Sequence, residues 1–277
     1  MPTISRDNTT IAYEATGHGE PLVLGHSFLL NREMWRPQID RLAGRYRVVA
    51  VDWRGHGESG PARGNVTLDD LADDVLAVLD AEGIERATWV GLSIGGMVAM
   101  REAIRDTGRV GALVLVDTDA DTWRTRDRVQ ARLLGLFARV AGTRPAAPAI
   151  PRMFFAARTR RQQPDLVARW RKSVETLSVP SVLCLLETLA RRPSMIDQVG
   201  AITVPTLIIH GANDASIPAA RAEQLHRAIP GSQLRLLPDC GHIASLDQPD
   251  LVGAAIEEFL GSLAASEAPP SWPGGPL

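Results

Sequence analysis

Short apolar runs rich in β-branched residues recur along the chain, and stretches with helical spacing separate them. The helical spacing is clearest after Thr67, where Leu71, Val75 and Val78 fall on one face and Asp70 completes a capping-box variant. Such alternation is typical of a parallel sheet that is covered by helices on both faces. The runs predicted to form the strands of this sheet are residues 21–24, 46–51, 87–90, 111–116, 205–209 and 233–237.

The same pattern divides the chain into a core, an insertion and a tail. Ahead of the first core strand, residues 3–4 and 10–15 flank Asp7-Asn8, a dipeptide typical of a hairpin turn at the edge of a sheet. We expect a core of residues 1–118 and 203–263. Residues 119–202 are arginine-rich and mostly helical in pattern, which predicts an inserted helical cap. Residues 264–277 have many prolines and few apolar residues, which predicts a disordered tail.

Composition limits the classes of partner. A chain of 277 residues that is 45% hydrophobic can bury one large core. The net charge of -2 leaves no basic surplus for a polyanion, so we expect no nucleic acid partner. We find no export signal and no apolar run of the ~20 residues that a membrane span needs, which favours a cytoplasmic protein without a membrane partner. The sequence leaves a homo-oligomer open.

The two cysteines give no structural framework. Cys184 and Cys240 are too few for a set of disulfides, and neither has a neighbouring cysteine at metal-ligand spacing. We expect both to be buried free thiols.

A serine lies between glycines where a predicted strand turns into a predicted helix. The segment from Gly91 to Gly95 matches Gly-x-Ser-x-Gly, with Ser93 at its centre, and the helical pattern then continues towards Arg105. The match alone is a weak signal, but strand, tight turn and helix together are the context of a nucleophile elbow. Glycines would keep side chains out of this turn. We therefore predict that Ser93 is a nucleophile at the carboxyl end of the sheet, where ligands bind in open α/β folds.

A serine nucleophile needs a base and a group that orients the base. Asp214 follows the strand predicted to end at residue 209, and His242 follows the strand predicted to end at residue 237. The two loops lie at the same edge of a parallel sheet, so His242 is the expected base and Asp214 the expected acid. Asp117, which follows the strand predicted over residues 111–116, is an alternative acid.

With these motifs the chain resembles the α/β-hydrolase superfamily. The resemblance implies an α/β-hydrolase fold, a mostly parallel central sheet flanked by helices, with Ser93, Asp214 and His242 as the catalytic residues. The motifs that carry it are Gly91 to Gly96, the H-G-x-x-D segment from His210 to Asp214, the Gly-His pair ending in His242, and the segment from Asp52 to Ser59, which is similar to the family's D-x-R-G-x-G-x-S loop.

One segment departs from the family pattern. The chain has His26-Ser27-Phe28 where the family usually carries His-Gly-x, so the backbone geometry of this loop is open. The variant resembles the 3-oxoadipate enol-lactone hydrolases and related small esterases more than lipases. By that resemblance, the oxyanion donors are the backbone N–H groups of Phe28 and Ile94. Trp123 and Ile243 are expected to line the substrate pocket.

The expected activity is two-step acyl transfer to water, which cleaves a small carboxylic ester or lactone and needs no metal or organic cofactor. A cofactor-free haloperoxidase or perhydrolase and a carbon–carbon bond hydrolase would use the same residues. A ligand-binding receptor of this fold is the alternative that is not an enzyme.

Two groups of cap residues carry weaker signals. Bulky residues could line the pocket, but most are expected to pack the cap onto the core; they are Trp123, Phe137, Met153, Phe154, Phe155 and Trp170. Arginines could hold an acidic substrate, but they are more typical of a solvated helix face; they include Arg124, Arg126, Arg128, Arg158, Arg160 and Arg161.

Overall fold

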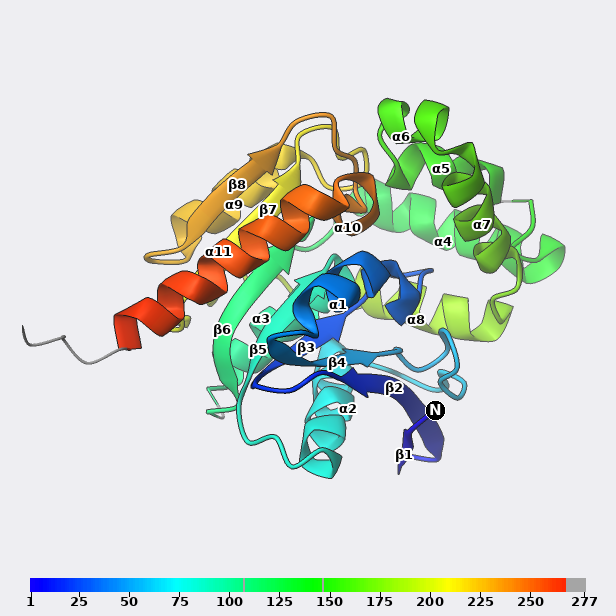
Figure 1. Ribbon diagram of the computed structural model, residues 1–277. Coiled ribbons are helices and arrows are strands. Elements are labelled where there is room, and N and C mark those ends of the chain that lie inside the picture. Colours follow the sequence, from blue (N-terminus) through cyan, green and yellow to red (C-terminus); the bar gives the residue numbers. More distant parts are fainter. Residues whose placement is uncertain (107, 146, 268–277) are drawn as a thin grey trace, which may run out of the picture.

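A computed structural model describes residues 1–106, 108–145 and 147–267 (Figure 1). Its centre is an eight-stranded sheet in the order β1-β2-β4-β3-β5-β6-β7-β8. From β4 onward along this order the strands pair in parallel, as predicted. The strands are β1 Thr3–Arg6, β2 Thr9–Thr16, β3 Glu20–Gly25, β4 Tyr46–Val51, β5 Ala87–Leu92, β6 Val110–Val116, β7 Thr206–Gly211 and β8 Gln233–Leu237.

The sheet is covered on both faces because alternate residues of its central strands enter different cores. In β3, Val23 packs into one cluster while Leu22 and Leu24 pack into the other. Helices α2 (Leu68–Ala81), α3 (Ile94–Arg105) and α9 (Ala219–Ala228) supply the first cluster, and α1 (Arg36–Leu42) and α11 (Pro249–Glu267) supply the second. Continuous apolar runs therefore form the strands.

The predicted hairpin lies at the edge of the sheet. Asp7 and Asn8 have φ of 49° and 59°, the left-handed pair that a tight hairpin turn requires. They join β1 to β2 in an antiparallel pair, and β2 pairs with β4 in the same sense. The predicted capping box is also present at α2, where the Asp70 N–H donates to Thr67 Oγ1 and the Thr67 N–H donates to Asp70 Oδ2.

Five helices occupy the described part of the insertion between β6 and β7, on one side of the molecule in Figure 1. Helix α8 joins this group to the core, since Leu185 and Leu189 are buried in the first apolar cluster. The helices of the insertion are α4 Thr125–Ala141, α5 Ile150–Phe154, α6 Ala157–Gln162, α7 Pro164–Glu175 and α8 Val179–Arg191.

Short 3-10 turns lie at Arg32–Trp35, Ala147–Ala149 and Val199–Ala201, and the short helix α10 at Ala244–Asp247 follows β8.

Two expectations need adjustment. Helix α11 continues to Glu267, into the segment predicted as a tail, and residues 268–277 lie outside the described residues. Cys240 is buried as expected, but Cys184 is only half-buried, because it sits at the margin where α8 meets the loop at Gly64.

In the described part of the chain, no single helix is long and apolar enough to cross a membrane. Within those same residues, only the pair α7 and α8, joined across a bend of 99°, reaches that length and composition.

Candidate active site

Ser93 stands at a strained turn between β5 and α3. Its φ of 54° and ψ of -115° are unfavourable for a residue with a side chain, and the surrounding backbone enforces them. The Ser93 N–H donates to the Val116 carbonyl, which extends the sheet by one residue. A Cβ at Gly91 would lie 2.2 Å from the carbonyl carbon of Gly95, and one at Gly95 would lie 2.2 Å from the carbonyl oxygen of Gly25. Only glycine fits at either place.

The three residues predicted to be catalytic lie in one hydrogen-bonded row. Ser93 Oγ is 3.1 Å from His242 Nε2, and His242 Nδ1 is 2.7 Å from Asp214 Oδ2. Asp214 is fixed in turn by the N–H groups of Ser216 and Ile217, which donate to its other oxygen. Since a carboxylate accepts from Nδ1–H, the Nε2 of a neutral imidazole is left as the acceptor that faces the serine.

Asp117, the alternative acid, is turned away from this row. Its two oxygens accept the N–H groups of Gly211 and Ala244, at 2.8 and 2.9 Å. Asp117 therefore links Gly211, at the end of β7, to Ala244, two residues after His242. Complete burial, together with the nearby charge of Asp214, raises the pKa of Asp117 well above its usual range.

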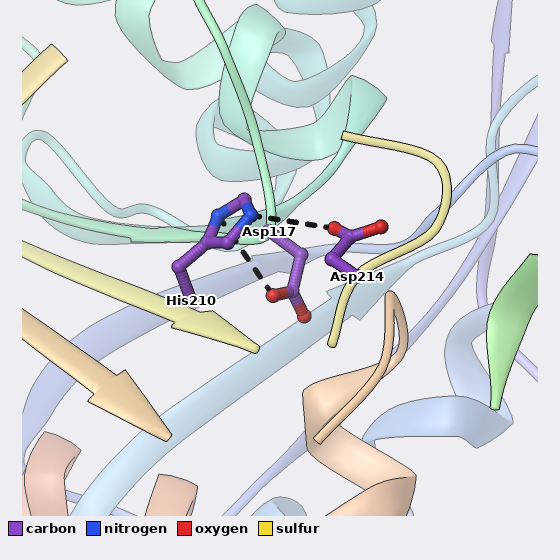
Figure 2. Close-up of side chains that lie close together, drawn as sticks. All are labelled: Asp117, His210 and Asp214. Atoms are coloured by element: carbon purple, nitrogen blue, oxygen red, sulfur yellow. Dashed lines mark ion pairs between the residues drawn. The ribbon is translucent and has the colours of Figure 1, made fainter. Parts of the chain in front are cut away.

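A second histidine lies against the carboxylates of Asp117 and Asp214 (Figure 2). His210 Nε2 is 2.8 Å from the Ile217 carbonyl and therefore donates to it, while 3.4 Å separates it from Asp214 Oδ2. Burial lowers the pKa of His210, which keeps the ring neutral. The three side chains group like metal ligands. However, all four carboxylate oxygens already accept N–H groups, which favours a positioning role over a metal site.

The loop after β3 leaves the backbone N–H of Phe28 unused among the described residues. The N–H groups of Ser27, Leu29 and Leu30 donate to Met34 Sδ, His56 Nε2 and the Ser27 carbonyl, respectively. The Phe28 N–H has no acceptor among the described residues. Ile94 is the first residue of α3, where N–H groups have no acceptor within the helix. Both predicted oxyanion donors are therefore free to bind an oxygen.

Two buried histidines hold this loop in place of the missing glycine. His26 Nε2 accepts the Trp53 N–H, and His56 Nε2 accepts the N–H of Leu29, whose φ is 68°. The left-handed residue of the loop is therefore Leu29, a position the sequence did not mark. Burial lowers the pKa of both histidines to about 3, so both remain neutral acceptors near pH 7.

The cap covers the row of catalytic candidates. The ring of Phe154, from α5, lies 6.0 Å from the ring of His242, and Ser93 is only 9% exposed. The Ile243 N–H donates to the Phe154 carbonyl, and the Ile243 side chain is fully buried. Trp123 is half-buried, with its ring 5.4 Å from the guanidinium of Arg192. Contact of Ile243 or Trp123 with a substrate stays a prediction.

A cavity of about 330 Å³ lies beside the Phe28 loop, between core and cap. Its lining is mixed, with hydroxyl groups on both sides. The residues include Leu29, Leu30 and Ser59 from the core and Ser173, Thr176 and Ser181 from the cap.

The other cap residues divide as follows. Phe154, Phe155 and Trp170 are buried, as expected for packing residues, whereas Phe137 and Met153 are exposed, so the packing expectation is wrong for these two. The arginines lie largely on exposed faces: Arg124, Arg126, Arg158 and Arg161 are exposed, and Arg128 and Arg160 are half-buried.

Comparison with known proteins gives a consistent picture. Residues 20–249 match the family model of the alpha/beta hydrolase fold. An esterase from Thermogutta terrifontis superposes with a TM-score of 0.89 at 31% identity, covering 94% of this chain and 97% of that one. The enol-lactonase from Burkholderia xenovorans gives 0.88 at 27%, covering 94% and 100%. The 3-oxoadipate enol-lactonase 1 of Acinetobacter baylyi is 27% identical, over 94% of this chain and 96% of its own. With its fold and the row formed by Ser93, His242 and Asp214, the chain belongs to the α/β-hydrolase family.

Proposed function

We propose that the protein is a serine hydrolase that cleaves a small carboxylic ester or lactone. One observation carries this proposal: a serine at a strained elbow is hydrogen-bonded to a histidine whose other nitrogen meets a buried aspartate. In a water-poor site this arrangement lets the imidazole take the serine proton as the hydroxyl attacks a carbonyl.

The reaction proceeds in two steps. Ser93 Oγ attacks the acyl carbon, His242 accepts the proton, and Asp214 holds the imidazole in the required tautomer. The free N–H groups of Phe28 and Ile94 stabilise the oxyanion. The alcohol leaves with the proton from His242, and water then attacks the acyl-enzyme by the same route. In a lactone, the leaving alcohol stays part of the released acid.

The burial of the catalytic row supports a small substrate. Below the cap, Ser93 is only 9% exposed, and His242 is buried beside Phe154. The relatives named esterase and enol-lactonase cover nearly the whole chain, which supports the same class of reaction.

A substrate screen tests the proposal. We expect kcat/KM on p-nitrophenyl esters to be highest at short acyl chains, because a closed pocket ends the gain of ~0.8 kcal/mol per buried CH₂. Enol-lactones and small lactones belong in the same screen, and adding hydrogen peroxide or a diketone separates perhydrolysis and carbon–carbon cleavage from hydrolysis. An optimum at C8 or beyond would contradict the small-substrate proposal, and no turnover of any ester or lactone would contradict the hydrolase.

A further inference from the structure

Helix α4 of the cap buries its small residues and exposes its large apolar residues. Its small residues Ala131, Gly135 and Ala138 face the protein, where Gly135 lies against the side chains of Leu183 and Leu186 from α8. Its large apolar residues face away from the protein and are 48–87% exposed. We name these six residues the α4 patch: Val129, Leu133, Leu134, Leu136, Phe137 and Val140.

Five of the six residues of the α4 patch form one continuous stripe, and Leu134 lies beside it. Val129, Leu133, Leu136, Phe137 and Val140 follow the i, i+4, i+7, i+8, i+11 spacing of a single helix face. An exposed apolar stripe of this length marks a surface that something else covers. An isolated solvent-facing helix would carry polar residues at these positions.

The cap that carries the patch has a strongly positive net charge. Residues 119–202 hold fifteen basic and seven acidic side chains, whereas the rest of the chain holds fifteen and twenty-five. On α4 itself, Arg126 and Arg139 are exposed, and neither pairs with a carboxylate among the described residues. A partner that covers the patch therefore meets an excess of positive charge.

A groove of about 390 Å³ joins the patch to α8. Its lining includes Leu136, Leu183 and Leu186 together with Arg132, Arg139 and Arg191. It also includes Glu187, whose carboxylate lies 3.8 Å from the Arg132 guanidinium, so the three arginines outnumber the one acid. Leucine side chains beside an excess of arginines match a molecule that has an acyl chain and an anionic head.

These features together fit an anionic lipid surface better than a protein. A symmetric contact between two caps would bring together two surfaces of the same charge, which disfavours a second copy. The patch is made of leucine, valine and phenylalanine and contains no tyrosine or tryptophan, unlike the centres of protein interfaces. A helix with an apolar face bordered by arginines is typical of segments that lie in the plane of a membrane interface.

We propose that the α4 patch docks the protein on a membrane surface containing anionic phospholipid, with the apolar side chains entering the acyl boundary and the arginines meeting the phosphates. Such peripheral contact needs no spanning helix. It therefore departs from the expectation of no membrane partner, which rested on the absence of a span.

Sedimentation with vesicles tests this proposal. The full chain should bind vesicles of phosphatidylglycerol and phosphatidylcholine, and should bind pure phosphatidylcholine at least about tenfold more weakly. Leu133→Ser with Phe137→Ser should lower the partition coefficient about tenfold or more. The double variant Leu236→Ser with Leu251→Ser is the matched control, since both side chains are exposed apolar residues outside the cap, in β8 and α11. It should bind like the wild type. Arg132→Gln with Arg139→Gln should weaken binding and reduce its salt dependence.

Three results would overturn the proposal. The first is no binding to the anionic vesicles, and the second is an equal loss of vesicle binding in the Leu236 and Leu251 control variant. The third is a dimer in light scattering that the Leu133 and Phe137 changes dissociate, which would assign the patch to a second copy. Circular dichroism checks that each variant is folded. Ser93→Ala should bind vesicles like the wild type, so the result is independent of the proposed hydrolysis.

Discussion

In β3, Leu22 and Val23 are neighbours that enter different cores, one on each face of the sheet. In α4, Leu133 and Leu136 face solvent, and Gly135 between them faces the protein. The sheet therefore uses its apolar residues for packing, and its polar residues at the carboxyl edge become the site. The cap uses small residues for packing at α4 and leaves large ones outside. A large apolar residue is therefore buried in the central strands, whereas on α4 it is exposed.

This comparison predicts that changes at the carboxyl edge of the sheet have the largest effects. Asp214→Asn should lower kcat by about 10⁴-fold while the protein stays folded, because the imidazole loses the partner that selects its tautomer. Asp117→Asn should reduce kcat far less but lower the melting temperature. An amide cannot accept at both ends, so one of the N–H groups of Gly211 and Ala244 loses its acceptor, at about 1–3 kcal/mol. If Asp117→Asn damages kcat more than Asp214→Asn, the acid is misassigned.

Replacing a glycine by alanine in each region should change the free energy of unfolding by different amounts. Gly95→Ala should destabilise the protein by about 3 kcal/mol or more, because the new Cβ would meet the backbone oxygen of Gly25 at 2.2 Å, and backbone at the centre of a sheet cannot yield. Gly135→Ala should stay within about 1 kcal/mol of the wild type. Its Cβ would meet only the flexible ends of the Leu183 and Leu186 side chains, at 3.1 and 3.4 Å, and alanine favours the helix. Thermal melts decide this, and equal losses would contradict the comparison.

Acid sensitivity that arises from histidines should also be confined to the core, since the cap contains no histidine. With a pKa of about 3 in the folded protein, His56 is neutral there, whereas the unfolded chain protonates it below pH ~6.5. The unfolded state then binds more protons, so stability from His56 is complete above pH ~6.5 and is lost as the pH falls towards 3. The stability difference between wild type and His56→Gln should shrink by up to about 1.4 kcal/mol per pH unit over this window. A difference that is constant from pH 7 to 4.5 would contradict the neutral, buried His56.

The sequence predicted the sheet well because its strands depend on local patterns, whereas the catalytic role of Ser93, His242 and Asp214 stays a prediction. Every predicted core strand is present within two residues at either end, since an apolar run between turn signals has few other uses. That Ser93, Asp214 and His242 lie together could be predicted because each follows a strand, and the carboxyl ends of parallel strands meet at one edge.

Other features depend on contacts that no local pattern records. His56 supports the Phe28 loop from a distant loop, and nothing in the sequence marks Leu29 as the left-handed residue. The helical spacing of α4 was visible as a pattern. However, periodicity states which residues share a face and not whether that face is inside, so the exposure of Phe137 was not predicted.

The central claim is that Ser93 is the nucleophile, and covalent labelling tests it most directly. A fluorophosphonate should add once to the wild-type protein, with loss of fluoride, and peptide mass spectrometry should place the adduct on Ser93 Oγ. Ser93→Ala should take up no label and hydrolyse no ester, and His242→Ala should label at least about 10²-fold more slowly, because its serine has no base. An adduct on another residue, or a Ser93→Ala protein that labels at the wild-type rate, would contradict the account.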